Sequence, residues 1–145
     1  MAKNIVQQAT FPVSPQTLYK MFLDSKEHSA ACGGKAKISP RVGGKFTAWD
    51  GSLWGRTLLL NPGKMIVQSW RSTGFKASDP DSILILKFSG DAKHGTISMI
   101  HANVPESDAK GVTSGWPLYY WKPWAKYLES RADGKGKGAK KTRAK

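Results

Sequence analysis

Histidine, serine and cysteine are the side chains of this chain that could do chemistry, and His101 stands out among them. It lies in a segment, residues 96–104, that is expected to form a strand. An imidazole with its ordinary pKa of about 6.5 exchanges protons near neutral pH, so general acid–base catalysis is one interpretation of His101. The other is a hydrogen-bonded core histidine. No neighbour in the sequence supplies a catalytic partner, which favours the structural interpretation.

The remaining candidates for catalysis or metal binding lack the necessary spacing. Ser69 and Ser98 lie in expected strands, but the sequence has no G-x-S-x-G pattern that would mark a nucleophile. His28 and Cys32 are four residues apart, yet no third ligand lies nearby, so no metal site is expected. The glycine pairs at 33–34 and 43–44 lack the spacing of phosphate-binding loops. The sequence therefore predicts no metal, no cofactor and no catalysis.

Length and composition predict one domain without disulfides. A chain of 145 residues can bury a substantial core, and its single cysteine, Cys32, cannot form an internal disulfide. The beginning, MAKNIVQQATF, has no apolar stretch typical of a signal peptide. No apolar run reaches the ~18 residues of a membrane span. These observations predict a cytoplasmic protein that does not insert into membranes.

Basic residues are concentrated at the end of the chain. The net charge is +13, and residues 133–145 contain six Lys and Arg residues against the single acid Asp133. This stretch has almost no large apolar side chains, so we expect residues 1–132 to form the domain and residues 133–145 a disordered basic tail. The tail is either a solubilising segment or a site of weak, non-specific nucleic-acid contact.

The most apolar segment is an expected helix over residues 113–131. On a helical wheel, Trp116, Tyr120 and Trp124 share one arc, and polar residues are confined to a narrow wedge. A helix that is apolar over more than half its circumference must be covered on several sides. Pro117 suits its first turn, and Pro123 is expected to kink it by freeing a carbonyl.

The remainder of the chain alternates between strand patterns and turn residues. Strands are expected over 5–11, 35–39, 45–49, 53–60, 65–71, 82–88 and 96–104, and short helices over 15–24 and 26–31. The succession of strands after residue 35, with a strong hairpin turn at Asp50-Gly51, predicts an antiparallel meander. Such a sheet must curl around an apolar element, and the long helix is the only one large enough.

This order resembles the START-like, or SRPBCC, helix-grip fold. The pieces FPVSPQTLYKMF, GGKFTAWDG, LWGRTLLLNPGKMIVQSWR, HANVP and GWPLYYWKPWAKYLE, together spanning about residues 5–130, resemble the family named for homology to the activator of the ATPase of heat shock protein 90. The resemblance implies an α+β fold. Its curved antiparallel sheet of six to seven strands would wrap around a long C-terminal helix, with two short helices after the first strand.

The resemblance also implies which positions face the interior. Phe88 and Ile97 are turned inward, and two polar residues, Gln68 and His101, are exceptions in a mostly apolar lining. The positions expected to line a cavity are Phe46, Ala48, Ile66, Gln68, Trp70, Leu84, Leu86, Met99, His101, Trp116, Tyr120 and Trp124. Bulky tryptophans could instead close the space, so an open pocket and a filled core both remain.

Three functions follow from these observations. The first is a non-enzymatic protein that holds a small apolar ligand between sheet and helix, as stand-alone family members are expected to do. The second is a stress-response module that contacts a chaperone through the outer sheet face, as the family name suggests. The third is a hydrolase or cyclase that uses His101 in the cavity, as in distant relatives of the fold.

Overall fold

The computed structural model describes residues 2–137, with side chains to residue 131. Seven strands form one antiparallel sheet in the spatial order β1-β7-β6-β5-β4-β3-β2. The strands are β1 (Lys3–Phe11), β2 (Lys37–Ile38), β3 (Lys45–Ala48), β4 (Leu53–Asn61), β5 (Met65–Ser72), β6 (Ser82–Gly90) and β7 (Gly95–Val104). The tail expected over residues 133–145 lies beyond the described side chains, and its disorder stays a prediction.

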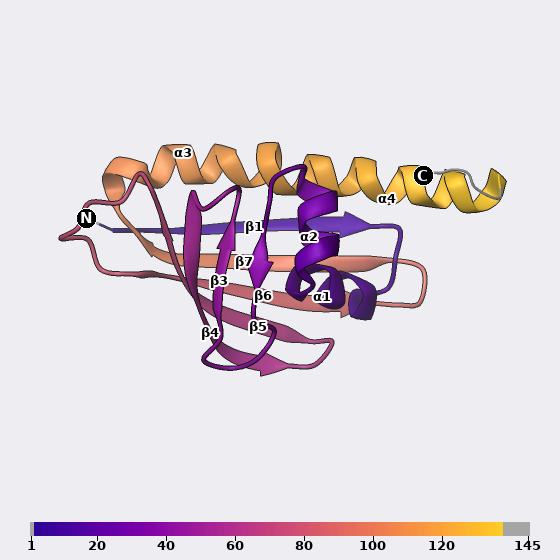
Figure 1. Cartoon of the computed structure of the whole chain (residues 1–145), viewed down its shortest axis with the longest axis horizontal. Coiled ribbons are helices and arrows are strands. Elements are labelled where there is room, and N and C mark those ends of the chain that lie inside the picture. Colours follow the sequence, from indigo (N-terminus) through magenta and orange to yellow (C-terminus); the bar gives the residue numbers. More distant parts are fainter. Residues whose placement is uncertain (1, 138–145) are drawn as a thin grey trace.

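Two helices follow the first strand, and three helical segments follow the last strand. They are α1 (Pro15–Leu23), α2 (Ser25–Cys32), α3 (Glu106–Trp116), the π-helical segment η1 (Pro117–Trp121) and α4 (Lys122–Lys137). The last three follow one another as a single long rod (Figure 1). Ser14 begins α1 by accepting a hydrogen bond from the backbone N–H of Thr17, and Pro15 occupies the first turn, as the sequence predicted.

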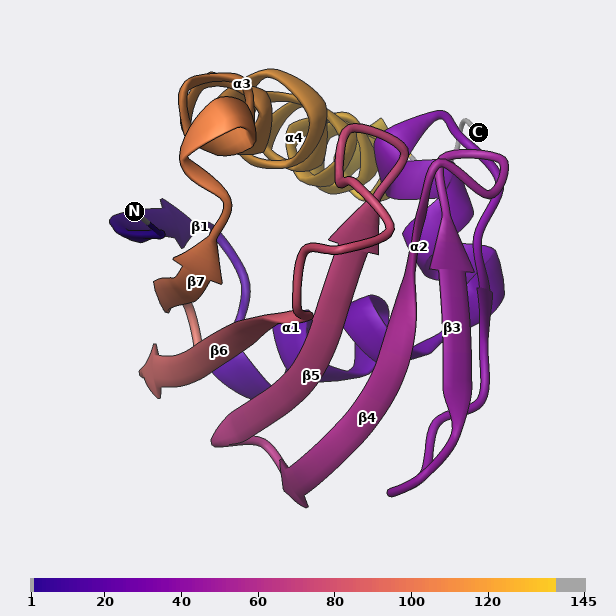
Figure 2. The same ribbon diagram turned by 90° about the vertical axis from the view of Figure 1, so that its left-hand side faces the viewer.

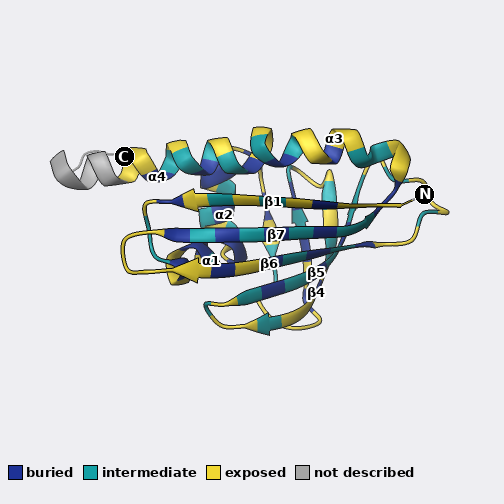
Figure 3. Cartoon of the chain, turned by 180° about the vertical axis from the view of Figure 1, so that it is seen from behind, coloured by how far each residue is buried: buried dark blue, intermediate teal, exposed yellow. Residues whose placement is uncertain are grey.

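The sheet is strongly curved, and the long rod lies across its concave side (Figure 2). Helix α3 packs against β1 and β7, whereas α1 packs against β6 and β7 and α2 against α4. Residues along each strand alternate between buried and more exposed positions (Figure 3). The predicted helix-grip architecture is confirmed. No helix within the described part of the chain is long and apolar enough to cross a bilayer.

The long helix begins earlier than the sequence indicated. It starts at Glu106, directly after Pro105, rather than at residue 113. Glu106 and Asp108 place negative charge in the first turn, where the helix dipole favours it. The buried side chains of Val112 and Trp116 pack this segment onto the molecule, and such packing can sustain a helix despite the low propensity of Gly111 and Gly115.

Pro117 consequently lies inside the rod and not in its first turn. Proline has no backbone N–H, so it leaves the carbonyl of Thr113 without its helical partner. The side chain of Gln7, on β1, donates to that carbonyl from Nε2 at 2.8 Å. The Oε1 atom of the same side chain accepts a hydrogen bond from Trp121 Nε1 at 2.8 Å. Gln7 thus ties the interrupted helix to the edge of the sheet.

The irregularity expected at Pro123 takes the form of the π-helical turn that precedes it. The backbone N–H of Lys122 bonds to the carbonyl of Pro117, five residues earlier. The extra residue in this turn changes which side chains of the helix point toward the sheet. Leu118 and Tyr119 are 56% and 49% exposed, so the helix is not covered on every side.

Two strands are shorter than the sequence suggested. Strand β2 covers only Lys37–Ile38, and β3 ends at Ala48. Trp49, expected as the last residue of β3, has a left-handed backbone with φ 50° and forms the turn together with Asp50. The predicted turn at Asp50-Gly51 is confirmed, but it begins one residue earlier.

The bond between Gln7 and Thr113 generates a stability prediction. Replacing Gln7 with Ala leaves both the Thr113 carbonyl and the Trp121 N–H without these partners. Because the partly buried Trp121 N–H would be left unsatisfied, at a cost of about 1–3 kcal/mol, we expect Gln7→Ala to lower the free energy of unfolding by a similar amount in urea denaturation. Gln8→Ala, an exposed neighbour on β1, is the control and should change it by less than about 0.5 kcal/mol. Equal effects of the two variants would contradict this role of Gln7.

Candidate functional site

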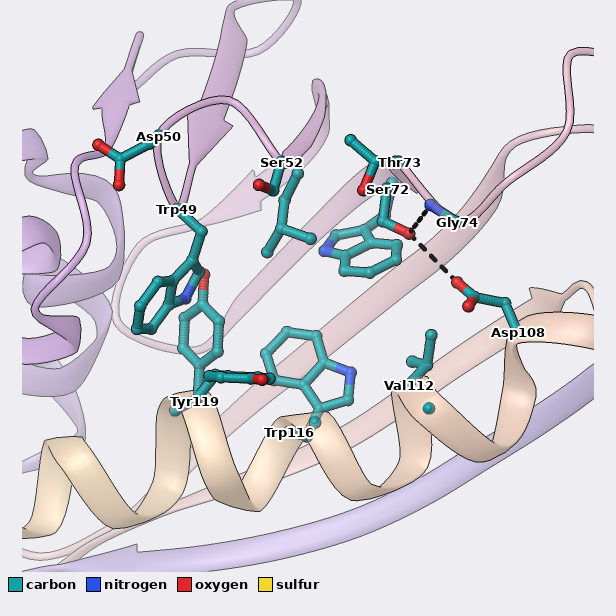
Figure 4. Close-up of a pocket in the computed structure, with 15 residues that line it drawn as sticks. Trp49, Asp50, Ser52, Ser72, Thr73, Gly74, Asp108, Val112, Trp116 and Tyr119 are labelled. Atoms are coloured by element: carbon teal, nitrogen blue, oxygen red, sulfur yellow. Dashed lines mark hydrogen bonds between the residues drawn. The ribbon is translucent and has the colours of Figure 1, made fainter.

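A pocket of about 670 Å³ lies beneath the N-terminal half of the long rod. Its walls come from α3, the first residues of η1, the β3–β4 turn and the loop that follows β5 (Figure 4). Because α3 packs toward β1 and β7, this side of the concave face is left uncovered. The lining residues are Trp49, Asp50, Ser52, Leu53, Trp70, Ser72, Thr73, Gly74, Asp108, Gly111, Val112, Gly115, Trp116, Tyr119 and Tyr120.

Two glycines open the helical wall of the pocket. The helical lining positions 108, 111, 112, 115, 116 and 119 recur at the spacing of one helix face. A Cβ atom built at Gly111 would meet only Asp108 Oδ1, at 3.8 Å, and one built at Gly115 would first meet the ring of Tyr119, at 3.5 Å. Both glycines therefore border free space, and larger side chains there would occupy the pocket.

The opposite wall contains Trp49 in an unusual backbone conformation. A bulky residue at φ 50° is strained, and such strain persists only where the surroundings hold it. Gly34 makes room for the indole, since a Cβ atom there would lie 2.5 Å from a ring carbon of Trp49. The ring of Tyr119 meets Trp49 edge to face, with centroids 5.3 Å apart. Trp49 Nε1 is buried and has no hydrogen-bond partner among the described residues.

A carboxylate stands at the other end of the pocket. Asp108 Oδ2 accepts a hydrogen bond from Ser72 Oγ at 3.2 Å, and Ser72 Oγ accepts one from the backbone N–H of Gly74 (Figure 4). A Cβ atom at Gly74 would lie 2.6 Å from Asp108 Oδ1, so glycine lets the carboxylate approach the loop. These contacts join α3 to the loop after β5.

His101 lies beneath the pocket, and both of its ring nitrogens take part in a series of hydrogen bonds. Trp116 Nε1 donates to His101 Nδ1 at 3.1 Å, so the imidazole proton must lie on Nε2. His101 Nε2 donates to Ser82 Oγ at 2.8 Å, and Ser82 Oγ donates to the Trp70 carbonyl at 2.6 Å. Burial lowers the pKa of His101 to about 3. The imidazole is neutral and both nitrogens are used, which favours the structural interpretation.

Both ring nitrogens of a second buried histidine, His28, are also hydrogen-bonded. His28 Nδ1 donates to the Phe22 carbonyl at 2.9 Å, and its Nε2 accepts from the Tyr120 hydroxyl at 2.9 Å. Burial lowers the pKa of His28 to about 4, although the bond to Phe22 opposes this. Cys32 accepts a hydrogen bond from Trp124 Nε1, and burial raises the pKa of its thiol to about 12, which makes it a poor nucleophile.

All twelve residues expected to line a cavity are buried, but they divide into two groups. Trp70, Trp116 and Tyr120 line the pocket. The indoles of Trp70 and Trp116 face each other with centroids 6.2 Å apart, as expected. Trp124 instead packs against Phe11 and Phe22. The nine residues that are buried away from the pocket lining are Phe46, Ala48, Ile66, Gln68, Leu84, Leu86, Met99, His101 and Trp124.

Sequence reasoning missed most of the remaining pocket residues. Those on the helix could have been found, because Asp108, Gly111 and Gly115 continue the helical spacing of Trp116 toward the N-terminus, and Tyr119 continues it toward the C-terminus. Residues of the two loops had no such periodicity.

Gln68, the other polar exception, donates to Thr57 Oγ1 at 3.3 Å, while its Oε1 has no partner among the described residues.

The sequence matches a family of known proteins. The family model described as activator of Hsp90 ATPase homolog 1-like protein matches residues 12–129. An activator of 90 kDa heat shock protein ATPase homolog from Dictyostelium discoideum is 27% identical over 115 residues, covering 79% of this chain. The human homolog 1 is 28% identical over 120 residues, covering 81% of this chain.

These relatives are much longer than the chain. The matches cover 30% of the Dictyostelium protein and 35% of the human one, so the chain spans about a third of their length. Among solved structures, an Hsp90 activator from Plasmodium falciparum superposes with a TM-score of 0.73 at 23% identity. That match covers 81% of this chain and 89% of the other, and it supports the fold.

The two buried histidines generate a prediction for pH. An unfolded histidine titrates near about 6.5, above the folded pKa values of His28 and His101. The unfolded chain therefore takes up protons first as the pH falls, and stability is lost from about pH 6.5 down toward the folded values. We expect the free energy of unfolding to drop by roughly 2–3 kcal/mol between pH 7 and pH 5.5.

Urea denaturation at the two pH values measures this drop. His101→Gln should remove about half of it, because one titrating group is lost. His94→Gln, at an exposed histidine, is the control and should leave the drop unchanged. A pH dependence that is equal in all three proteins would contradict the assignment of neutral buried histidines.

Proposed function

Since this chain belongs to the family of activator of Hsp90 ATPase homolog 1-like proteins, we propose that it is a non-enzymatic, cytoplasmic binding protein. It holds a small, mainly apolar ligand between the sheet and the long helix. The observation that carries the proposal is the pocket beneath α3, where two glycines leave the helix face bare among aromatic rings. Pockets of this kind, with few polar groups, are the usual form of small-molecule sites.

The packing around the pocket supports a stable binding site. Its floor is formed by Trp70 and Trp116. His101 accepts a hydrogen bond from Trp116 Nε1, and its imidazole meets the Trp70 ring edge to face with centroids 4.5 Å apart. A rigid wall lowers the entropic cost of binding. Tyr119, by contrast, is 49% exposed and stands at the mouth, where its ring can adjust to a ligand.

The same hydrogen bonds support a non-enzymatic role. A histidine that acts as a general base needs a free ring nitrogen within reach of its substrate. Both nitrogens of His101 are occupied, and the Ser82 hydroxyl is directed at a carbonyl rather than activated by a base. Within the described residues, no group of three or more His, Cys, Asp or Glu side chains is placed to hold a metal ion.

Filling the pocket from its helical wall tests this proposal. Gly115→Leu adds a side chain that projects into free space and also raises helix propensity, by about 0.5–1 kcal/mol. We therefore expect the variant to remain folded, with unchanged or higher stability, and to lose affinity for an apolar probe at least about tenfold. The measurement is the emission of the uncharged dye N-phenyl-1-naphthylamine during titration, together with quenching of tryptophan fluorescence.

The matched control is Ser114→Leu, which adds the same side chain to the adjacent exposed position outside the pocket. It should bind the probe as the unaltered protein does. Two results would count against a ligand pocket: no uptake of the dye by the unaltered protein, or equal uptake by the Gly115 and Ser114 variants.

A second candidate function is docking onto a chaperone of the 90-kDa heat shock class. It is favoured by an apolar row that crosses the outer face of five neighbouring strands. The strand register aligns Val6, Ile100, Ile85, Val67 and Leu59 in this row. The two ends are exposed, 73% at Val6 and 45% at Leu59. A continuous apolar row on an outer face is a feature of protein-interaction surfaces.

The chemistry beside this row indicates an acidic partner. A groove of about 550 Å³ on the same face is lined by Lys45, Arg56, Arg71 and Asp81 around the exposed ring of Trp54. Arg71 forms an ion pair with Asp81 at 3.1 Å, so the excess positive charge of the groove comes from Lys45 and Arg56. Lys45 and Arg56 are directly opposite each other in the register, and like charges in such pairs destabilise a sheet. A negatively charged partner would relieve this repulsion.

Adding negative charge to the apolar row tests the second candidate. We expect the double variant Val6→Glu with Leu59→Glu to weaken binding to a purified 90-kDa heat shock chaperone at least about tenfold, because buried unpaired charge is costly. Biolayer interferometry measures the affinity. Ser130→Glu, on the exposed side of α4, is the control and should bind normally. Absence of binding by the unaltered chain would remove this candidate.

A further inference from the structure

The charged groups in the pocket lining are acids, although the chain as a whole is strongly basic. The sequence has 23 Lys and Arg residues against 10 Asp and Glu residues. Among the lining residues that the structure describes, however, Asp50 and Asp108 are the charged ones, and none is Lys, Arg or His. The pocket thus reverses the charge balance of the rest of the molecule.

Five aromatic side chains line the pocket together with these acids. Trp49, Trp70, Trp116, Tyr119 and Tyr120 all contribute to the lining. The faces of indole and phenol rings carry negative electrostatic potential and attract cations, most strongly where water is displaced. An anionic ligand would meet the opposite conditions, since it would face both the rings and the carboxylates.

Asp108 is placed to select the charge of a ligand. Figure 4 shows its carboxylate at one end of the pocket, with Trp116 between it and Tyr119. Ser72 Oγ donates to Oδ2 at 3.2 Å, which orients the carboxylate. Asp108 is partly buried, so its interaction with a nearby cation is less weakened by solvent than that of a fully exposed acid.

From this arrangement we infer that the ligand is an organic cation, an apolar ring compound that carries an amine or quaternary ammonium group. The ring body lies against Trp70 and Trp116, and the cationic group lies at the Asp108 end. This inference rests on the proposed ligand-binding function of the same pocket and specifies its ligand.

Three probes of equal shape and different charge test the inference on the unaltered protein. They are a naphthylmethyl trimethylammonium ion, its uncharged isostere with carbon in place of nitrogen, and a naphthyl carboxylate of similar size. Equilibrium dialysis measures their affinities. We expect the cation to bind about tenfold more tightly than the uncharged isostere and the carboxylate to bind most weakly.

Asp108→Asn tests the residue that selects the charge. It keeps the shape of the side chain, and we expect it to bind the cation and the uncharged isostere with similar affinity, while the affinity for the isostere stays unchanged. Glu129→Gln changes the net charge by the same amount on the exposed face of α4 and should retain the tenfold preference.

The outcomes distinguish a failure of the inference about ligand charge from a failure of the proposed ligand-binding function. Equal binding of the cation and the isostere by the unaltered protein, or tighter binding of the carboxylate, overturns the inference and leaves the ligand pocket standing. A preference that persists in Asp108→Asn also overturns it. If none of the three probes binds, both the inference and the proposed ligand-binding function fail.

Discussion

The concave face of the sheet has to be covered by one long helix, and the position of that helix determines the rest of the structure. Pro117 interrupts the hydrogen bonds of the helix, and Gln7 on β1 satisfies the carbonyl that is left over. Trp121 bonds to the same side chain and packs against Phe11. These contacts hold the helix toward the β1 edge. The side near the β3–β4 turn remains uncovered, and the pocket lies there.

The polar groups inside the molecule serve to fix aromatic rings. His101 orients Trp116, His28 bonds to the hydroxyl of Tyr120, and Cys32 accepts from Trp124. Each of these aromatic side chains brings one polar group into the core, and an unpaired polar group there would be costly. The histidines are therefore neutral structural partners. Both ring nitrogens of each of these two histidines are engaged in hydrogen bonds inside the core.

Two surfaces of the molecule differ in their chemistry. The pocket is aromatic and acidic, and the outer sheet face is aliphatic and basic. They lie on opposite faces of the sheet, so occupation of one does not block the other. A family member with a bound small ligand could thus still present its outer face to a protein. The two candidate functions are compatible, and each depends on a different set of residues.

The sequence alone determined the architecture and the inward faces of the strands. The family resemblance implied the inward positions, Ile66, Leu84 and Met99 among them, and period-two alternation supports several of these sets without knowledge of their partners. Hydrophobic periodicity and turn residues indicated the order of the elements, and the family motifs then identified the fold with that order. The helical part of the pocket was also readable in principle, because Gly111 and Gly115 follow the spacing of Trp116.

Only the tertiary structure decided where the cavity lies and which buried residues reach it. His101 and Trp124 were predicted to line it, yet their partners come from segments distant in the sequence, Ser82 and Phe11 among them. Trp49 became a pocket residue because its backbone turns left-handed, a strain that Gly34 and the surrounding contacts sustain. Such features depend on the packing of several elements at once, and no local pattern in the sequence encodes them.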